Sequence, residues 1–312
     1  MKNSILIIDE PVSCQTIKTG YFDIFEKYLA SLDIKPRSKD TYRKSLKQFM
    51  NFINSRVSQT EICRTDILAY KTYLLDNYAA NTVSTYITAV KGFYAYLEAE
   101  KISPNVAAGI KGAKSQKGFR KDSLTIEQIH NVITGIDTKT IYGKRNFSLV
   151  NLLIRTGLRT IEAQRANIED IRQEGGESLL YIQGKGHDSK DEFVLLTEST
   201  HRPIREYIKA TGRTKGPLFI SHSDRNHGKR LTTRSISRIA KEAMLTSGID
   251  SSRLTAHSFR HTAVTLSLLA GASIQETQGM ARHTNINTTM IYAHNINRIK
   301  NAPERKIDEL LR

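Results

Sequence analysis

Apolar side chains recur at helical spacing in four stretches of the first hundred residues. The first covers residues 16–32, and the others begin near Ser38, Thr65 and Asn81, each with an apolar side chain every three or four positions. Pro36 separates the first two stretches, and an acidic residue follows Thr65, as at many helix N-termini. We therefore predict four helices whose tyrosine and phenylalanine side chains form a shared core rather than a surface for stacking on bases.

A change in composition separates this helical block from the rest of the chain. Residues 111–121 contain five basic residues, two glycines, no acidic residue and no periodicity, which is typical of a linker. We predict an N-terminal extension over residues 1–15 and a helical domain over residues 16–110. In a protein that grips DNA, the basic linker would lie along phosphates.

Beyond the linker the pattern becomes mixed. Two strand-like runs, residues 179–182 and 192–196, flank a turn at residues 184–189, as in a β-hairpin. A tail over residues 296–312 places apolar side chains on one face of a further helix. The predicted fold is therefore mainly α with a small antiparallel β-hairpin or sheet, the second domain being α+β over residues 122–295. Its predicted helices cover residues 124–136, 144–158, 200–210, 233–247, 256–270 and 273–281.

Composition and charge narrow the class of partner. The chain has 47 Lys and Arg against 31 Asp and Glu, a net charge of +16, and such an excess attracts nucleic-acid phosphates. A basic membrane-surface helix would want exposed tryptophan or phenylalanine, and the chain has no tryptophan. No apolar run approaches the roughly 18 residues of a membrane span. Two cysteines cannot make a disulfide framework. We expect a cytoplasmic, nucleoid-associated protein that binds nucleic acid and no membrane.

Several enzyme signatures are absent from the sequence. It contains no P-loop motif, and the Gly-Lys-Gly segment at residues 184–186 lacks the third glycine of a dinucleotide-binding fingerprint. His257 and His261 stand four residues apart, as zinc ligands on a helix do. Arg260 between them would repel a metal, and no glutamate occupies the position of a general base. We therefore expect no metal site.

What remains is a concentration of residues that bind phosphate or move protons. Arg159 follows a strongly apolar helical stretch, His257 and Arg260 share one helix face, and Tyr292 comes nine residues after His283. Two arginines can clamp a phosphodiester and stabilise a pentacoordinate transition state, and a tyrosine phenolate can attack its phosphorus. Each residue alone is more often structural, but together they predict phosphodiester transfer without magnesium.

In this order the residues resemble the tyrosine recombinases, the integrase family of Xer, Cre and phage-type enzymes. The family pattern is an arginine in a T-G-L-R segment, a lysine in a hairpin turn, H-x-x-R, and a histidine or tryptophan nine residues before a nucleophilic tyrosine. The N-terminal helices also look like the family's four-helix core-binding domain, so the resemblance covers nearly the whole chain. The matching positions are Arg159, Lys185, His257, Arg260, His283 and Tyr292.

The resemblance implies a role for each of these side chains. Arg159 and Arg260 would bind the scissile phosphate, while His257 and His283 would hydrogen-bond to it or assist proton transfer. Tyr292 would form a 3′-phosphotyrosine bond that stores the energy of the broken linkage. No ATP, metal or other cofactor is therefore implied.

The general acid and its surroundings follow from the same resemblance. Lys185 would protonate the leaving 5′ oxygen, and Glu162 would hold Arg159 in position without touching the DNA. The hairpin is longer than is common in the family and lacks the usual arginine and proline in its second strand. Lys190 therefore stays open as an alternative acid, with Lys185 favoured.

One departure from the family pattern concerns the turn before the second histidine. Ala281 and Arg282 stand where the family usually has leucine and glycine, and Arg282 would either touch DNA or restrain the turn. Basic residues expected to contact DNA are Lys111, Lys114, Lys117, Arg120, Lys121 and Arg282.

The resemblance also implies an assembly. Four protomers would act on two double-stranded DNA sites through a Holliday junction, with the tail helix packed either in trans on a neighbour or in cis. A directionality factor or a second recombinase stays open as a further partner. The choice between mobile-element integration or excision and Xer-type resolution also stays open. Two other functions remain as alternatives: a type IB topoisomerase and a DNA-bending protein without catalysis.

Overall fold

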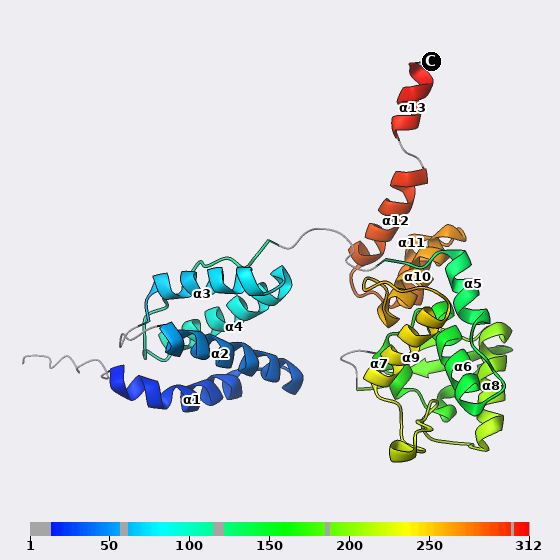
Figure 1. Cartoon of the computed structure of the whole chain (residues 1–312), viewed down its shortest axis with the longest axis horizontal. Coiled ribbons are helices and arrows are strands. Elements are labelled where there is room, and N and C mark those ends of the chain that lie inside the picture. The colour runs from blue at the N-terminus through cyan, green and yellow to red at the C-terminus, as the bar shows by residue number, and fades with distance from the viewer. Residues whose placement is uncertain (1–13, 57–61, 115–121, 185–187, 301–302, 312) are drawn as a thin grey trace, which may run out of the picture. The chain divides into compact units, whose positions relative to one another are not determined.

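The chain consists of two compact units, Met1–Gly118 and Phe119–Arg312, and each is described by itself (Figure 1). Both are helical, and the predicted class, mainly α with a small antiparallel sheet, is confirmed. No helix in the described ranges is long and apolar enough to cross a membrane. The computed structural model describes residues 14–56, 62–114, 122–184, 188–300 and 303–311.

Four helices form the N-terminal unit: α1 (Cys14–Ser31), α2 (Pro36–Arg56), α3 (Arg64–Asn77) and α4 (Ala80–Ala99). α2 and α4 share the largest contact, and α1 and α3 each pack against both of them. The core is aromatic, with Phe25 edge-on to Phe93 at 4.5 Å between ring centroids and Phe49 edge-on to Tyr70 at 5.0 Å. The prediction that these aromatic side chains are core is confirmed.

Two helix starts differ from the predicted ones. α2 begins at Pro36 rather than Ser38, because proline suits the first turn of a helix, where its missing N–H has no partner to lose. α3 is capped by Cys63 and not by Thr65, and the backbone N–H of Cys63 donates to Asp66 Oδ2 at 2.8 Å. In both places the helix starts earlier than the apolar pattern alone indicates.

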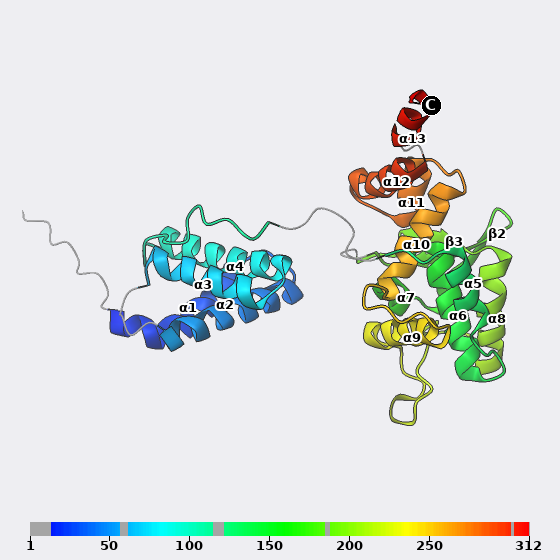
Figure 2. The same ribbon diagram turned by 45° about the horizontal axis from the view of Figure 1, so that its top comes forward.

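The C-terminal unit is built around α6, in which every residue from Ser148 to Ile154 is buried. α8 and α10 pack on either side of it, and Figure 2 shows α6 and α8 side by side. A helix buried all round needs apolar side chains on every face, which explains the continuous apolar run. The helices of this unit are α5 (Ile126–Thr134), α6 (Ile141–Thr156), α7 (Thr160–Arg165), α8 (Glu198–Thr211), α9 (Thr233–Thr246), α10 (Ala256–Leu269), α11 (Ile274–Ala281), α12 (Ile286–Lys300) and α13 (Pro303–Leu310).

A three-stranded antiparallel sheet, in the order β1-β2-β3, lies at the edge of this core. β2 (Glu177–Ile182) and β3 (Glu192–Leu195) form the predicted hairpin, and Leu180 pairs with Val194, both buried. The first strand, β1 (Ile171–Glu174), was missed, because only Ile171 in it is partly buried and no alternating pattern marks it.

The C-terminal end differs from the prediction of one tail helix beginning at residue 296. α12 runs through that position from Ile286 to Lys300, and the separate α13 begins at Pro303. No residue of α13 is buried, and the side chains of Ile307, Leu310 and Leu311 are exposed. This apolar face is uncovered within the described part of the chain.

Candidate active site

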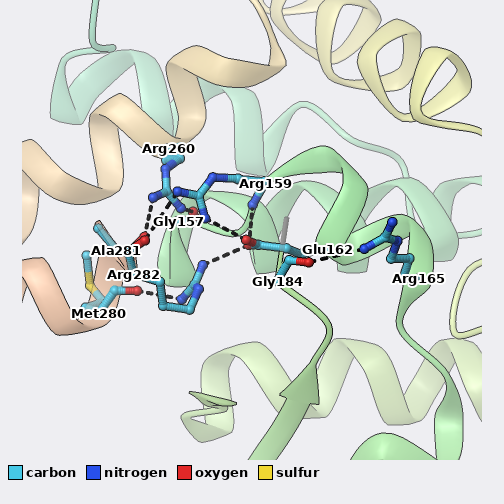
Figure 3. A network of polar contacts seen from close by, with 9 residues as sticks. All are labelled: Gly157, Arg159, Glu162, Arg165, Gly184, Arg260, Met280, Ala281 and Arg282. Carbon is cyan, nitrogen blue, oxygen red and sulfur yellow. Dashed lines mark hydrogen bonds and ion pairs between the residues drawn. The ribbon is translucent and has the colours of Figure 1, made fainter. Parts of the chain in front are cut away.

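The end of α6 turns sharply to present Arg159. Gly157 closes the helix in the left-handed conformation (φ 62°), and its backbone N–H donates to Leu153 O at 3.1 Å. A Cβ at this glycine would lie 3.3 Å from the Ala263 Cβ on α10, so the position favours glycine for space as well as for backbone angle. Arg159 then occupies the N-cap position of α7, and its side chain lies beside that of Arg260 on α10 (Figure 3).

A fully buried carboxylate, Glu162, holds Arg159 in place. Arg159 donates from its backbone N–H to Oε2 at 2.8 Å and from Nη1 to Oε1 at 2.7 Å. Arg282 donates from Nη2 to the same Oε2 at 3.0 Å, so one carboxylate joins two guanidinium groups (Figure 3). Burial alone would raise the pKa of Glu162, but the charge of Arg282 and the hydrogen bonds from Arg159 hold that pKa below its ordinary value.

Arg282 folds back onto the protein. Its backbone is left-handed (φ 53°), its side chain is only 5% exposed, and Nη1 donates to Met280 O at 2.6 Å. The position that usually holds glycine in the family therefore carries an arginine whose side chain folds back onto Glu162. Of the two roles expected for Arg282, restraint of the turn fits this geometry, and contact with DNA stays a prediction.

Arg260 connects the turn after α6 with the end of α11. From its buried position on α10 it donates to Gly157 O at 2.7 Å through Nη1 and to Ala281 O through Nη2. Arg159 Nη2 donates to the next carbonyl, Arg282 O, at 3.3 Å. Burial, helped by the charges of Arg159 and Arg282, lowers the pKa of Arg260 to about 10, so the group stays cationic at neutral pH.

Tyr292 lies on α12 in a small hydrophobic cluster of its own. It is 6% exposed and packs with Val264 and Ala281, apart from the main core of the unit. Burial raises the pKa of Tyr292 to about 12, with Arg260 opposing the rise. Its hydroxyl makes a hydrogen bond with Nδ1 of His261, and the two ring centroids are 5.5 Å apart.

His261 was missed as a site residue, because its only interpretation from sequence was as half of a zinc pair. The signal that could have found it is its place on α10, one residue after Arg260 and one helical turn after His257. The His257 ring, which is exposed, meets the His261 ring edge-on at 4.7 Å between centroids. In the described residues no group of three His, Cys, Asp or Glu side chains gathers to hold a metal ion.

His283 is a second histidine close to Tyr292. Its ring lies nearly parallel to the tyrosine ring with centroids 6.4 Å apart, and its Nδ1 hydrogen-bonds Thr289 Oγ1 at 2.9 Å. Burial and the charges of Arg260, Arg159 and Arg282 lower the pKa of His283 to about 4. The imidazole is therefore neutral at pH 7 in the unliganded protein.

Of the two candidate general acids, Lys185 and Lys190, only Lys190 lies within the described residues. Lys185 lies outside the described residues, but the preceding Gly184 carbonyl accepts a hydrogen bond from Arg165 Nη1 at 3.2 Å (Figure 3). Lys190 is ion-paired with the buried Asp170 at 2.5 Å. α7 thus carries Arg159 and also anchors the end of the hairpin strand that leads to Lys185.

The expected DNA-contacting residues of the linker are only partly described. Lys111 and Lys114 have exposed side chains, whereas Lys117, Arg120 and Lys121 lie outside the described residues. The segment that bears the first two is tied to its own unit, because Ser84 Oγ donates to Ala113 O at 3.1 Å.

Two family models match the chain in succession. The model of the phage integrase family matches residues 122–298, and that of the phage integrase N-terminal SAM-like domain matches residues 21–103. This chain belongs to the phage integrase family. As a tyrosine recombinase, it is an enzyme of site-specific recombination that cleaves and rejoins DNA.

Relatives and solved structures extend along most of this recombinase. It is 26% identical over 286 residues to tyrosine recombinase XerD of Listeria monocytogenes serotype 4b, covering 88% of this chain and 91% of the relative. Tyrosine recombinase XerC of Herpetosiphon aurantiacus is 28% identical over 284 residues, covering 86% and 89%.

Solved structures show the same fold. The post-cleavage complex of the XerH site-specific recombinase bound to palindromic difH substrate superposes with a TM-score of 0.71 at 19% identity, covering 85% of this chain and 80% of that one. A lambda integrase tetramer bound to a Holliday junction gives 0.71 at 18% identity, covering 94% and 81%.

Proposed function

We propose that this recombinase cleaves one strand of its DNA site with Tyr292, forming a 3′-phosphotyrosine bond and a free 5′ hydroxyl. The observation that carries the proposal is that Tyr292 lies beside His261 and His283 on the helix that follows a turn held by two arginines. Arg260 and Arg159 donate to the consecutive carbonyls of Ala281 and Arg282, in the turn that leads through His283 to α12. A phosphodiester beside Tyr292 would therefore meet two positive charges.

Charge balance in the site supports a phosphate ligand. Glu162 is the carboxylate that touches Arg159 and Arg282, and Arg260 is held by backbone carbonyls, so the cluster has more positive than negative charge. A bound anion such as a phosphate would balance the excess positive charge of this cluster. The excess also stabilises the charge that develops on the phosphate oxygens as Tyr292 attacks.

The leaving 5′ oxygen needs a proton, and Lys185 remains our candidate donor. Arg165 donates to the carbonyl of Gly184, the residue directly before Lys185 in the chain. Lys190, the alternative, would first have to leave Asp170, with which it forms a largely buried ion pair. That exchange makes Lys190 the less favourable acid.

The assembly belongs to the same proposal. A lambda integrase tetramer bound to a Holliday junction shares this fold, and four copies of this chain would likewise act on two double-stranded DNA sites. The exposed apolar side chains of Ile307 and Leu310 on α13, with Leu311 directly after it, are suited to pack in trans on a neighbouring protomer. The reaction would serve integration or excision of a mobile element or Xer-type resolution, with a directionality factor or a second recombinase as further partners.

The test is covalent capture on a selected site. Tyr292→Phe protein would select binding duplexes from a random-sequence library, and nicked versions of these would then be mixed with each protein and denatured. We expect a covalent adduct with the wild type and with Tyr181→Phe, a control whose hydroxyl donates to Glu174 on the sheet. We expect none with Tyr292→Phe, although it binds the duplex normally. An adduct with Tyr292→Phe would assign the nucleophile elsewhere, and sequence-specific binding without any adduct would favour a non-catalytic role.

A further inference from the structure

The hydroxyl that would attack DNA is hydrogen-bonded to a histidine outside the six motif positions. His261 projects from the middle of α10, and its Nδ1 lies within hydrogen-bond reach of Tyr292 Oη on α12. The contact joins the reacting oxygen to a basic nitrogen with no other group between them. Geometry therefore places a proton acceptor at the one atom that must lose a proton during strand cleavage.

We propose that His261 accepts the Tyr292 phenol proton during cleavage and returns it during rejoining. This rests on the proposed role of Tyr292 as nucleophile. In cleavage the Oη–H bond breaks and the proton goes to His261 Nδ1, the Oη–P bond forms, and the bond from phosphorus to the 5′ oxygen breaks. The 5′ oxygen takes a proton from the hairpin lysine. In rejoining, the hairpin lysine takes back the proton of the 5′ hydroxyl as that oxygen attacks phosphorus. The Oη–P bond breaks, and Tyr292 leaves with the proton from His261.

The other two histidines are less suited to this step. His283 commits Nδ1 to Thr289 Oγ1 at 2.9 Å, and its ring lies nearly parallel to the tyrosine ring rather than in line with the hydroxyl. His257 is exposed and meets the edge of the His261 ring. These positions leave His257 and His283 suited to the phosphate, while His261 serves the nucleophile.

Burial and the neighbouring positive charges keep the His261 ring neutral, so that Nδ1 is available to accept a proton. Burial, then the nearby His257 and Arg260 of α10 and His283 before α12, lower the pKa of His261 to about 4, so its ring is neutral at physiological pH. Tyr292, with a pKa raised to about 12, does not ionise on its own. Because the two pKa values lie far apart, the proton moves as the Oη–P bond forms rather than before it.

The decisive variant is His261→Asn. Asparagine Oδ1 can occupy roughly the place of Nδ1 and accept the hydrogen bond, but it cannot take up the proton, so positioning and basicity are separated. The control is His130→Asn, an exposed histidine on α5 remote in sequence from these motifs. The probe is the nicked duplex selected with Tyr292→Phe protein, made with sulfur in place of the bridging 5′ oxygen. Thiolate leaves without a proton, so its cleavage reports deprotonation of the nucleophile and not the action of the lysine.

We expect wild type and His130→Asn to cleave the sulfur duplex at a rate that is level between about pH 6 and pH 9 and falls as the pH approaches about 4. His261→Asn should be slower by about 10²-fold at pH 7 and should gain roughly tenfold for each rise of one pH unit. DNA affinity and melting temperature should not change. In His261→Ala, added imidazole should restore part of the lost rate.

Several results would overturn the assignment. A His261→Asn profile parallel to that of the wild type would make His261 a positioning residue only. If His261→Asn cleaves the sulfur duplex as fast as the wild type but ordinary DNA more slowly, His261 assists protonation of the leaving 5′ oxygen instead. Failure of imidazole to restore His261→Ala would likewise contradict proton acceptance. If the wild type forms no adduct, Tyr292 is not the nucleophile and this proposal fails with the proposed function. If the wild type forms an adduct and the pH profile of His261→Asn is unaltered, only the role of His261 fails.

Discussion

Replacing Glu162 by glutamine should destabilise the C-terminal unit more than any change at a surface ion pair. The side chain of Glu162 is fully buried, and Arg282, one of its two partners, is itself 5% exposed. Removing the negative charge would leave a buried guanidinium without its counter-ion. Breaking a buried pair in this way typically costs about 3–5 kcal/mol, which for a unit of this size lowers the melting temperature by roughly 6–20 °C.

The pH dependence provides a second measure of the same group. The pKa of Glu162 is held below its ordinary value of about 4.5 in the folded protein. Its ionised form therefore stabilises the fold above that pH, and the benefit is lost as the pH falls through the lowered pKa. The difference in stability between wild type and Glu162→Gln should be full at pH 7 and should shrink below about pH 4.5.

The assay is calorimetric unfolding of the full chain. Glu26→Gln is the matched control, because Glu26 forms an equally short pair with Arg43 on the exposed surface of the N-terminal unit, where solvent screens the charges. Arg282→Met in the Glu162→Gln background should recover part of the loss, since the unpaired buried charge is then gone. A Glu162→Gln cost below about 1 kcal/mol, or one that Arg282→Met leaves unaltered, would refute this account of the buried cluster.

Two further predictions concern the backbone and the C-terminus. Gly157→Ala should lower stability by more than the roughly 1–2 kcal/mol of left-handed strain, because the new Cβ also lies 3.3 Å from Ala263. Gly212→Ala has the same strain and open space around it, so equal losses in thermal unfolding would contradict the packing argument. Leu310→Asp should leave cleavage of a single nicked site intact but reduce recombination between two sites and tetramer formation by sedimentation. Loss of cleavage itself would contradict trans packing.

The helical architecture was predictable because burial imposes a period on the sequence. Phe49 and Phe93 mark buried helix faces in the N-terminal unit, and the unbroken apolar run around Leu152 marks a helix surrounded by protein. The strand β1 was not predictable in the same way. This strand is held by its antiparallel pairing with β2. Arg172 and Gln173 are both exposed, so the sequence shows no alternation of buried and exposed side chains there.

The site was predictable in its residue types and less so in its contacts. Motif spacing predicted Arg159, Arg260 and Tyr292, which the fold brings around one turn. It could not show that Arg282 folds inward onto Glu162, because an arginine in an unusual left-handed backbone has no signature in a single sequence. Nor could it show that His261, rather than another histidine, meets the tyrosine hydroxyl, since that contact depends on how α10 and α12 pack.

The small cluster that holds Tyr292 has a consequence for how the nucleophile is used. Val264, Ala281 and Tyr292 form a hydrophobic cluster separate from the main core, and we expect α12 to open at a lower free-energy cost than unfolding of the whole domain. Delivery or withdrawal of the tyrosine is then a local opening event. Contacts made at the end of α12 can then change how often this helix opens, while the cluster of Arg159, Arg260 and Arg282 stays assembled.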